Sequence, residues 1–206
     1  PGRDLREKIE VSLAWKRVAR EVADGTLGIW QTLSRTVPMA LMGAAAAVHG
    51  GRLYLFGGEN GGNTKDTIYF APIHEDGTLG DFVTHGSLPG ARRNLFGGIY
   101  NGVLVVAGGN DGTSELSDTW KNTLSPEGYL GAWTSGPTLP VANSAMAGAM
   151  GGGYLYLAGG VSAGSSVYYA RVGAPQASTK SGFSKVYDIG VNGWYNSIGV
   201  SGTAAG

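Results

Sequence analysis

The sequence predicts an all-β fold made of short, repeated, four-stranded sheets, and three observations support this prediction. First, 37 of the 206 residues are glycine, and each glycine inside a helix destabilises it by roughly 1 kcal/mol relative to alanine. Second, three kinds of sequence landmark recur with one shared period of about 51 residues. Third, every repeat contains a short apolar run that ends at a glycine doublet, which is typical of a buried strand.

Composition and charge exclude several classes of protein. The hydrophobic fraction of 42% is sufficient for a core, so the chain is not expected to be intrinsically disordered. Fifteen basic and fifteen acidic residues give a net charge of zero, so we expect no nucleic-acid partner. The chain has no cysteine, which excludes disulfides, thiol nucleophiles and thiolate metal sites. No apolar run is long enough to predict a membrane span.

The repeat is defined by three landmarks that keep the same order along the chain. They are an acidic residue that opens an acidic-Gly-x-Leu-Gly turn (Asp24, Asp76, Glu127), a proline (Pro38, Pro89, Pro140) and a glycine doublet (Gly57-Gly58, Gly108-Gly109, Gly159-Gly160). Because three independent landmarks share one period, we interpret each period as one structural unit.

Four strands are expected in each unit. In chain order they are a segment of small residues (43–48, 95–100, 145–150), an apolar run (52–56, 103–107, 154–158), an aromatic-containing run (67–70, 118–120, 167–169) and a run that begins at an aromatic residue (30–33, 82–88, 133–139). Alanine and glycine in the first strand let neighbouring sheets approach closely. Four short strands in about 50 residues is typical of a propeller blade.

These features resemble the kelch repeat, and more closely the galactose-oxidase-like kelch type of microbial and phage surface proteins. The residues that carry the resemblance are the strand ending at Gly57-Gly58, the later Tyr69 or Trp120, and the spaced Trp30, Phe82 and Trp133. The resemblance covers residues 14–172 and implies kelch-type β-propeller blades, about three in number, in an incomplete ring. It implies little about function, because kelch blades serve enzymes, adhesins and adaptors alike. The recurrence of the aromatic residues predicts core packing between blades.

Three regions are predicted along the chain. Residues 1–23 are expected to form the terminal strand of a preceding incomplete blade, with a helix as the alternative, and residues 24–172 form the blades. Residues 173–206 are expected to contain a linker and then strands that either begin a further β-domain or close the last blade. Since propellers typically have 4 to 8 blades, we expect a longer polypeptide or ring completion by other subunits.

The loops after the glycine doublets are the most promising binding sites, because functional residues favour loops on a rigid scaffold. Their acids, amides and hydroxyls suit sugar hydroxyls or Ca²⁺, although tight turns use the same residue types. Arg92 and Arg93 precede the inner strand of the second repeat, where one of them either binds an anionic ligand such as an acidic sugar or bonds neighbouring carbonyls. The candidate ligand-binding residues are Glu59, Asn60, Asn63, Arg92, Arg93, Asn110, Asp111 and Ser162.

No catalytic residue, metal site or cofactor is predicted. The three histidines lack ligand spacing, and without cysteine the Tyr–Cys cross-link of galactose oxidase cannot form. The acidic turn residues recur in every repeat, whereas an active site needs one constellation unlike the others.

The sequence therefore predicts a non-enzymatic binding or structural module of an extracellular, cell-surface or virion protein, such as a phage tail component. Its expected partners are surface glycans or proteins, contacted through the loops. Two alternatives stay open, namely a fragment of a propeller enzyme that acts on carbohydrate, and an assembly scaffold.

Overall fold

The computed structural model describes residues 28–172, 184–188 and 200–201, and the regular structure in these ranges is all β-strand. No helix in the described ranges is long and apolar enough to cross a membrane. Residues 1–34 and 35–206 form two compact units. The strands all lie in the second unit, and the predicted strand or helix at residues 1–23 falls outside the described ranges.

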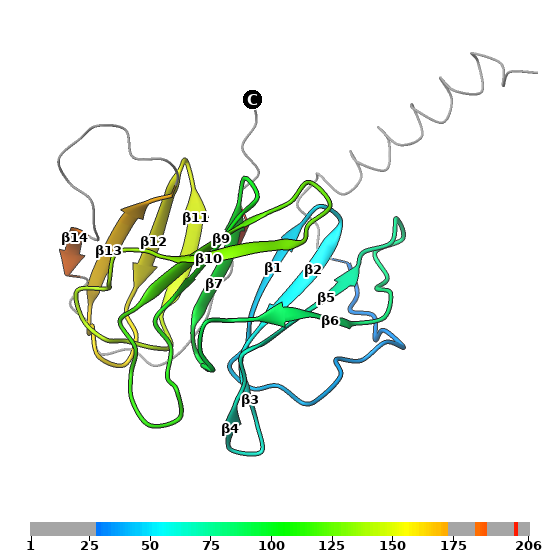
Figure 1. Cartoon of the computed structure of the whole chain (residues 1–206), viewed down its shortest axis with the longest axis horizontal. Coiled ribbons are helices and arrows are strands. Elements are labelled where there is room, and N and C mark those ends of the chain that lie inside the picture. The colour runs from blue at the N-terminus through cyan, green and yellow to red at the C-terminus, as the bar shows by residue number, and fades with distance from the viewer. Residues whose placement is uncertain (1–27, 173–183, 189–199, 202–206) are drawn as a thin grey trace, which may run out of the picture. The chain divides into compact units, whose positions relative to one another are not determined.

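Three sheets follow one another along the chain, two of four strands and one of five. Each contains a set of four antiparallel strands, and we call these sets the first, second and third blades (Figure 1). The first contains β1 (Ala45–His49), β2 (Arg52–Phe56), β5 (Thr67–Pro72) and β6 (Val83–Ser87). The second contains β7 (Phe96–Tyr100), β8 (Val103–Ala107), β9 (Thr119–Leu124) and β10 (Leu130–Ser135). The third contains β11 (Ala147–Gly151), β12 (Tyr154–Ala158), β13 (Ser166–Arg171) and β14 (Ser184–Asp188). The predicted all-β fold of four-stranded blades is therefore confirmed, and the described strands do not close into a ring.

Two additions complete the strand list. The short strands β3 (Glu59–Asn60) and β4 (Asn63–Thr64) form a separate hairpin after β2. The strand β15 (Val200–Ser201) pairs in parallel with β11. In the third sheet β14 pairs with β13, which is the position that β6 and β10 take in the other two sheets.

The second strand of every blade begins and ends at the predicted residues. β2, β8 and β12 are the apolar runs 52–56, 103–107 and 154–158, and each stops at the following glycine doublet. The doublets end the strands because both glycines have positive φ, for example 56° at Gly108 and 102° at Gly109, a conformation that residues with a Cβ rarely adopt.

The blades pack face to face through their inner strands, β1 against β7 and β7 against β11. One core cluster, which includes Tyr54 and Leu104, lies between the first and second blades. A second cluster, which includes Val105 and Leu157, lies between the second and third. Small residues allow this approach, because a Cβ on Gly148 would lie 2.4 Å from the ring of Phe96.

Side chains alternate along each strand, so every blade has two faces. We call the side that carries Tyr54, Val105 and Tyr156 the front face, and the side that carries Leu53, Leu104 and Leu155 the back face. In the two core clusters the front face of one blade meets the back face of the next.

One predicted strand is wrong. Residues 30–33 form no strand, although the repeat places a fourth strand there. A strand forms only by pairing with a neighbour, and the expected neighbour lies within residues 1–23, outside the described ranges.

The predicted role of the aromatic residues in packing holds for some of them. Tyr69 is buried, and the half-buried Trp133 packs against the first core cluster and donates from Nε1 to Ser87 O at 2.9 Å. Trp30 belongs to the separate unit of residues 1–34, so its predicted packing between blades stays a prediction.

Candidate functional site

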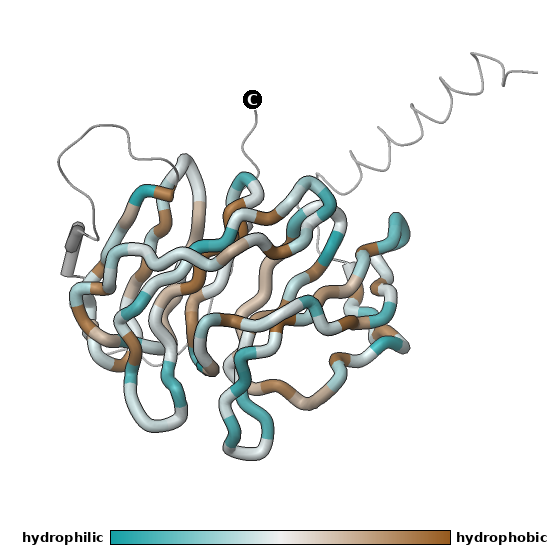
Figure 2. The backbone as a smooth tube through the Cα atoms, in the orientation of Figure 1, coloured by the Kyte–Doolittle hydropathy of each residue, from teal (hydrophilic) through white to brown (hydrophobic). Residues whose placement is uncertain are grey.

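The loops after the glycine doublets are the candidate functional site, and we call residues 59–64, 110–115 and 161–165 the loop surface. Figure 2 shows the hairpin β3–β4, which forms the first of these loops, as a largely hydrophilic segment. Its tip is Gly61-Gly62, with φ of 56° and 82°, which are the positive values that a tight two-residue hairpin turn requires. The sequence did not predict these two short strands.

The first and second loops lie side by side, as the hairpin and the β8–β9 loop do in Figure 1. Thr64 Oγ1 donates a hydrogen bond to Asp111 O at 2.9 Å, and Arg93 forms an ion pair with the buried carboxylate of Glu59. Arg93 also pairs through its backbone with Asn110. Three of the predicted site residues, Glu59, Arg93 and Asn110, are thus brought together where two blades meet.

Side chains of the second loop stabilise the loop itself. Asp111 Oδ1 accepts hydrogen bonds from the backbone N–H groups of Ser114 and Thr113, both at 2.8 Å, and these bonds hold the pKa of Asp111 below its ordinary value. Asn110 Oδ1 accepts from Gly112 N at 2.8 Å, and its amide donates to Glu115 Oε1 at 3.0 Å. This is the turn chemistry that competes with a ligand-binding interpretation of the same residues.

The third loop is held by Asn143, which is fully buried and which the sequence did not single out. Its Oδ1 accepts from Ser162 N at 2.8 Å, and its Nδ2 donates to Gly159 O at 2.8 Å. Asn143 N also donates to Leu116 O at the end of the second loop. Asn143 therefore links the second and third loops.

The other candidate residues of the first loop are Asn60 and Asn63. Asn60 Nδ2 donates to Ala40 O at 2.7 Å, while the exposed Asn63 donates to Gly61 O at 3.3 Å. Asn63, Asp111 and Ser162 are exposed members of the loop surface, so they are in a position to meet a ligand.

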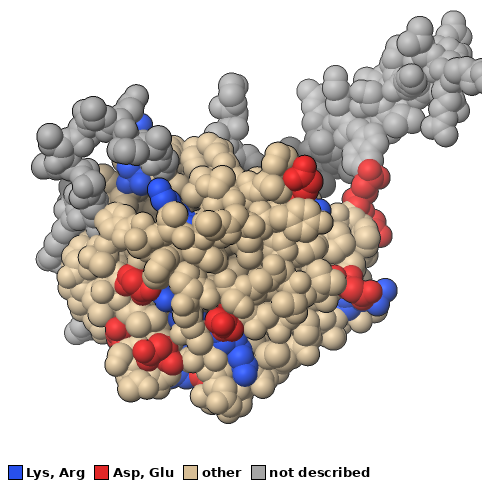
Figure 3. All heavy atoms as spheres, viewed as in Figure 1, with Lys and Arg blue, Asp and Glu red and all other residues tan. Residues whose placement is uncertain are grey.

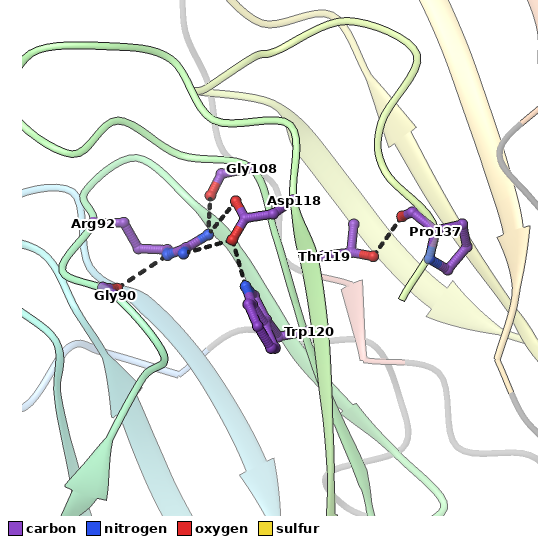
Figure 4. A network of polar contacts seen from close by, with 7 residues as sticks. All are labelled: Gly90, Arg92, Gly108, Asp118, Thr119, Trp120 and Pro137. Carbon is purple, nitrogen blue, oxygen red and sulfur yellow. Dashed lines mark hydrogen bonds and ion pairs between the residues drawn. The ribbon is translucent and has the colours of Figure 1, made fainter. Parts of the chain in front are cut away.

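Arg92 lies away from solvent and contacts protein acceptors (Figure 4). Its two terminal nitrogens each bond one oxygen of Asp118 at 2.9 Å, and Nη1 also reaches Gly108 O at 3.2 Å. Nε donates to Gly90 O at 3.1 Å. The guanidinium therefore holds the connection between the first two blades against β8 and β9.

Asp118 is the partner that sequence reasoning missed. Burial raises its pKa, but the hydrogen bonds from Arg92 and Trp120 and the charge of Arg92 outweigh this effect, so the pKa lies below its ordinary value. A signal for the pair was present, because Arg92 and Asp118 both depart from the repeat. The other blades carry Leu41 or Asn143 in place of Arg92, and Thr67 or Ser166 in place of Asp118.

The charged residues do not gather into one electrostatic field on the face drawn in Figure 3, where acidic and basic side chains are scattered among neutral ones. Among the described residues, no group of three or more His, Asp or Glu side chains is arranged to hold a metal ion. The chemistry that the loop surface offers is therefore mainly hydrogen bonding by amides, hydroxyls and backbone groups.

A family model described as the kelch motif matches residues 40–69. The match covers β1, β2, the first glycine doublet and the β3–β4 hairpin, and it ends inside β5. No curated protein matches the chain. Together with the repeated antiparallel sheets, the match supports a kelch-type repeat fold, and kelch repeats are generally binding or protein-interaction modules.

Proposed function

We propose that this chain is a non-enzymatic binding module that contacts its ligand through the loop surface. Our proposed ligand is a neutral or weakly acidic surface glycan, and the proposed setting is an extracellular, cell-surface or virion protein. We also propose that the blades are of the galactose-oxidase-like kelch type and that the protein is a component such as a phage tail protein.

The observation that carries the proposal is the way the three loops are held together. The bond from Thr64 Oγ1 to Asp111 O fixes the first loop against the second, and Asn143 fixes the second against the third. A pre-organised surface loses less conformational entropy when it binds. The adjacent loops therefore favour one extended contact rather than three independent ones.

The residue types support a sugar as the ligand. The exposed positions carry the amide of Asn63, the carboxylate of Asp111 and the hydroxyl of Ser162, which are donors and acceptors suited to sugar hydroxyls. Asp111 uses Oδ1 for its own turn, so Oδ2 is the oxygen that we assign to a ligand hydroxyl.

A glycan array probed with the labelled chain tests the proposal. We expect defined glycans to bind, and we expect Asn63→Ala and Asp111→Asn each to weaken that binding. Asp111→Asn is the sharper variant, because an asparagine Oδ1 still accepts the bonds from Thr113 and Ser114 while the carboxylate is lost.

Asp76→Asn is the matched control. Asp76 forms the same kind of turn with Thr78, but it follows β5 and so lies at the opposite strand end from the β3–β4 hairpin. Glycan binding that Asp76→Asn reduces as much as Asp111→Asn does would contradict the assignment to the loop surface. Turnover of a bound glycan, abolished by one loop substitution, would instead establish the carbohydrate-enzyme alternative.

A further inference from the structure

The front face of the third blade differs from the equivalent faces of the other two blades. Tyr54, Val105 and Tyr156 occupy the same position in successive blades, 51 residues apart. Tyr54 is 0% exposed and Val105 is 9% exposed, because the following blade covers each of them, whereas Tyr156 is 45% exposed.

Three tyrosine rings form this open face. Tyr154, Tyr156 and Tyr169 have ring centroids separated by 6.0 to 6.4 Å, and the rings of Tyr156 and Tyr169 are stacked with an interplanar angle of 23°. Tyr156 and Tyr169 lie directly opposite each other on β12 and β13. We call these three residues the tyrosine face.

The glycine doublets show the same difference. A Cβ on Gly57 would lie 2.5 Å from Arg92 O, and one on Gly108 would lie 2.4 Å from Asn143 O, since the chain entering the next blade packs against both glycines. At Gly159 the nearest described atom is Gly164 O of the same loop, at 3.8 Å. Two independent observations therefore mark the third blade as the one without a described successor.

The back face of the first blade shows the complementary difference. Val48, Ile99 and Met150 are equivalent residues on the inner strands. Val48 is 57% exposed, whereas Met150 is 8% exposed beneath the preceding blade. Leu53 and Leu55 are half-buried, while their equivalents in the second blade, Leu104 and Val106, are 0% exposed.

We infer that the tyrosine face is an interaction surface whose occupant is the back face of the first blade in a second copy of this chain. Within the chain, front faces are covered by back faces, so the occupant requires no new type of contact. Head-to-tail contacts form closed rings where the rotation between subunits allows closure. Two copies with three described blades each would supply six blades, within the 4 to 8 of known propellers. This interface is separate from the loop surface.

The contact between the first two blades specifies one atom pair of the proposed interface. Tyr54 OH donates to Gly128 O at 3.1 Å, in the turn between β9 and β10. Tyr156 is the equivalent of Tyr54, and Gly77 in the first blade is the equivalent of Gly128. The Tyr156 hydroxyl of one copy is therefore assigned to Gly77 O of the other.

Sedimentation velocity over a range of concentrations tests the inference with the full chain. We expect a dimer for the unaltered chain, and monomers for Tyr156→Glu and for Val48→Glu. Val141→Glu is the control, because Val141 is 42% exposed and lies in the connection between β10 and β11. Tyr156→Phe should still dimerise, with a dissociation constant up to about a hundredfold higher because one hydrogen bond is lost at each of the two interfaces.

A mixing experiment makes the test specific. Each single variant lacks both interfaces of a two-copy ring, but the Val48→Glu copy keeps its tyrosine face and the Tyr156→Glu copy keeps its back face. An equimolar mixture therefore contains one intact interface and should form heterodimers, which also establishes that both variants are folded. Dimers that Tyr156→Glu abolishes and Val48→Glu leaves unchanged would overturn the inference in favour of a tyrosine-to-tyrosine contact. An unaltered chain that is monomeric at every concentration would overturn it as well.

Discussion

Arg92 and Asn143 stand 51 residues apart in the sequence, and each donates a side-chain hydrogen bond to the first glycine of the doublet in its own blade. Arg92 Nη1 reaches Gly108 O at 3.2 Å, and Asn143 Nδ2 reaches Gly159 O at 2.8 Å. The backbone carbonyl of each also accepts a bond from the preceding doublet, from Gly58 N to Arg92 and from Gly109 N to Asn143. One structural position thus connects consecutive blades, with a charged side chain in one and a neutral one in the other.

The ion pair between Arg92 and Asp118 should contribute much more to the free energy of unfolding than an exposed ion pair does. Arg92→Ala leaves the carboxylate of Asp118 half-buried without its partner, so we expect a loss of roughly 2–4 kcal/mol in the free energy of unfolding, reduced from the fully buried case because Asp118 is 36% exposed. Arg35→Ala is the matched control, because the Arg35–Asp81 pair is exposed and should contribute at most about 1 kcal/mol. Urea unfolding of both variants measures the difference, and equal losses would contradict a structural role for Arg92.

Asn143, the neutral side chain at this position, should stabilise the third loop. Asn143→Ala removes the acceptor of Ser162 N and the donor to Gly159 O, and leaving these part-buried backbone groups unpaired costs about 1 kcal/mol, the low end of the range for buried groups. Hydrogen exchange should show faster exchange at the Ser162 amide, with little change at the Thr113 amide, which bonds Asp111 instead. Asn63→Ala, on an exposed residue of the first loop, should leave both amides unchanged, and comparable acceleration in that variant would contradict the assignment.

Equivalent glycines should differ in their tolerance of a methyl group. Gly108 and Gly159 have φ of 56° and 66°, so alanine is strained at both by roughly 1–2 kcal/mol. At Gly108 the new Cβ also meets Asn143 O at 2.4 Å, whereas at Gly159 the nearest described atom is 3.8 Å away. We expect Gly108→Ala to destabilise the chain by about 1–3 kcal/mol more than Gly159→Ala, as measured by thermal unfolding of the two variants. Similar losses at the two glycines would contradict this difference in packing.

The sequence predicted the parts of the fold that depend on local pattern. β2, β8 and β12 were predicted to the residue because an apolar run and a glycine doublet mark both their nature and their end. The β3–β4 hairpin was not predicted, because strands of two residues leave no periodicity to detect. Residues 30–33 carry the landmark of a fourth strand, yet the pairing that makes a strand depends on a neighbour and not on the landmark.

The candidate site was predictable as a location and not as a set of contacts. The glycine doublets located the loops, but the turn bonds of Asp111 and the ion pair between Arg93 and Glu59 depend on how the loops lie against each other. Asp118, the partner of Arg92, is the contact that the sequence could most readily have predicted. Two opposite charges that depart from the repeat in the same unit, Arg92 and Asp118, were a signal that they pair.

The stability of the contact between the first blade and the β9–β10 turn of the second blade should depend on pH through His85. This residue lies against Phe70, with ring centroids 4.8 Å apart, and one ring nitrogen is 2.9 Å from Gly128 O. Burial lowers the pKa of His85, and the charge of Arg52 acts in the same direction, which outweighs the opposite effect of the Gly128 bond. The folded chain therefore keeps His85 neutral at a pH where the unfolded chain, with the ordinary value of 6.5, already binds a proton.

The direction of the pH effect follows from this difference in proton binding. The unfolded state binds more protons, so the contribution of His85 to stability is fully present above pH 6.5 and is lost as the pH falls through the folded pKa. Urea unfolding between pH 7.5 and 5 should show this decline, and His85→Gln should reduce it, while His74→Gln, in an exposed turn, provides the control for losing a histidine. The Asp118 pair acts in a separate range, because its lowered pKa affects stability only around and below the ordinary value of 3.8. A decline that His85→Gln leaves unchanged would show that another group titrates on unfolding.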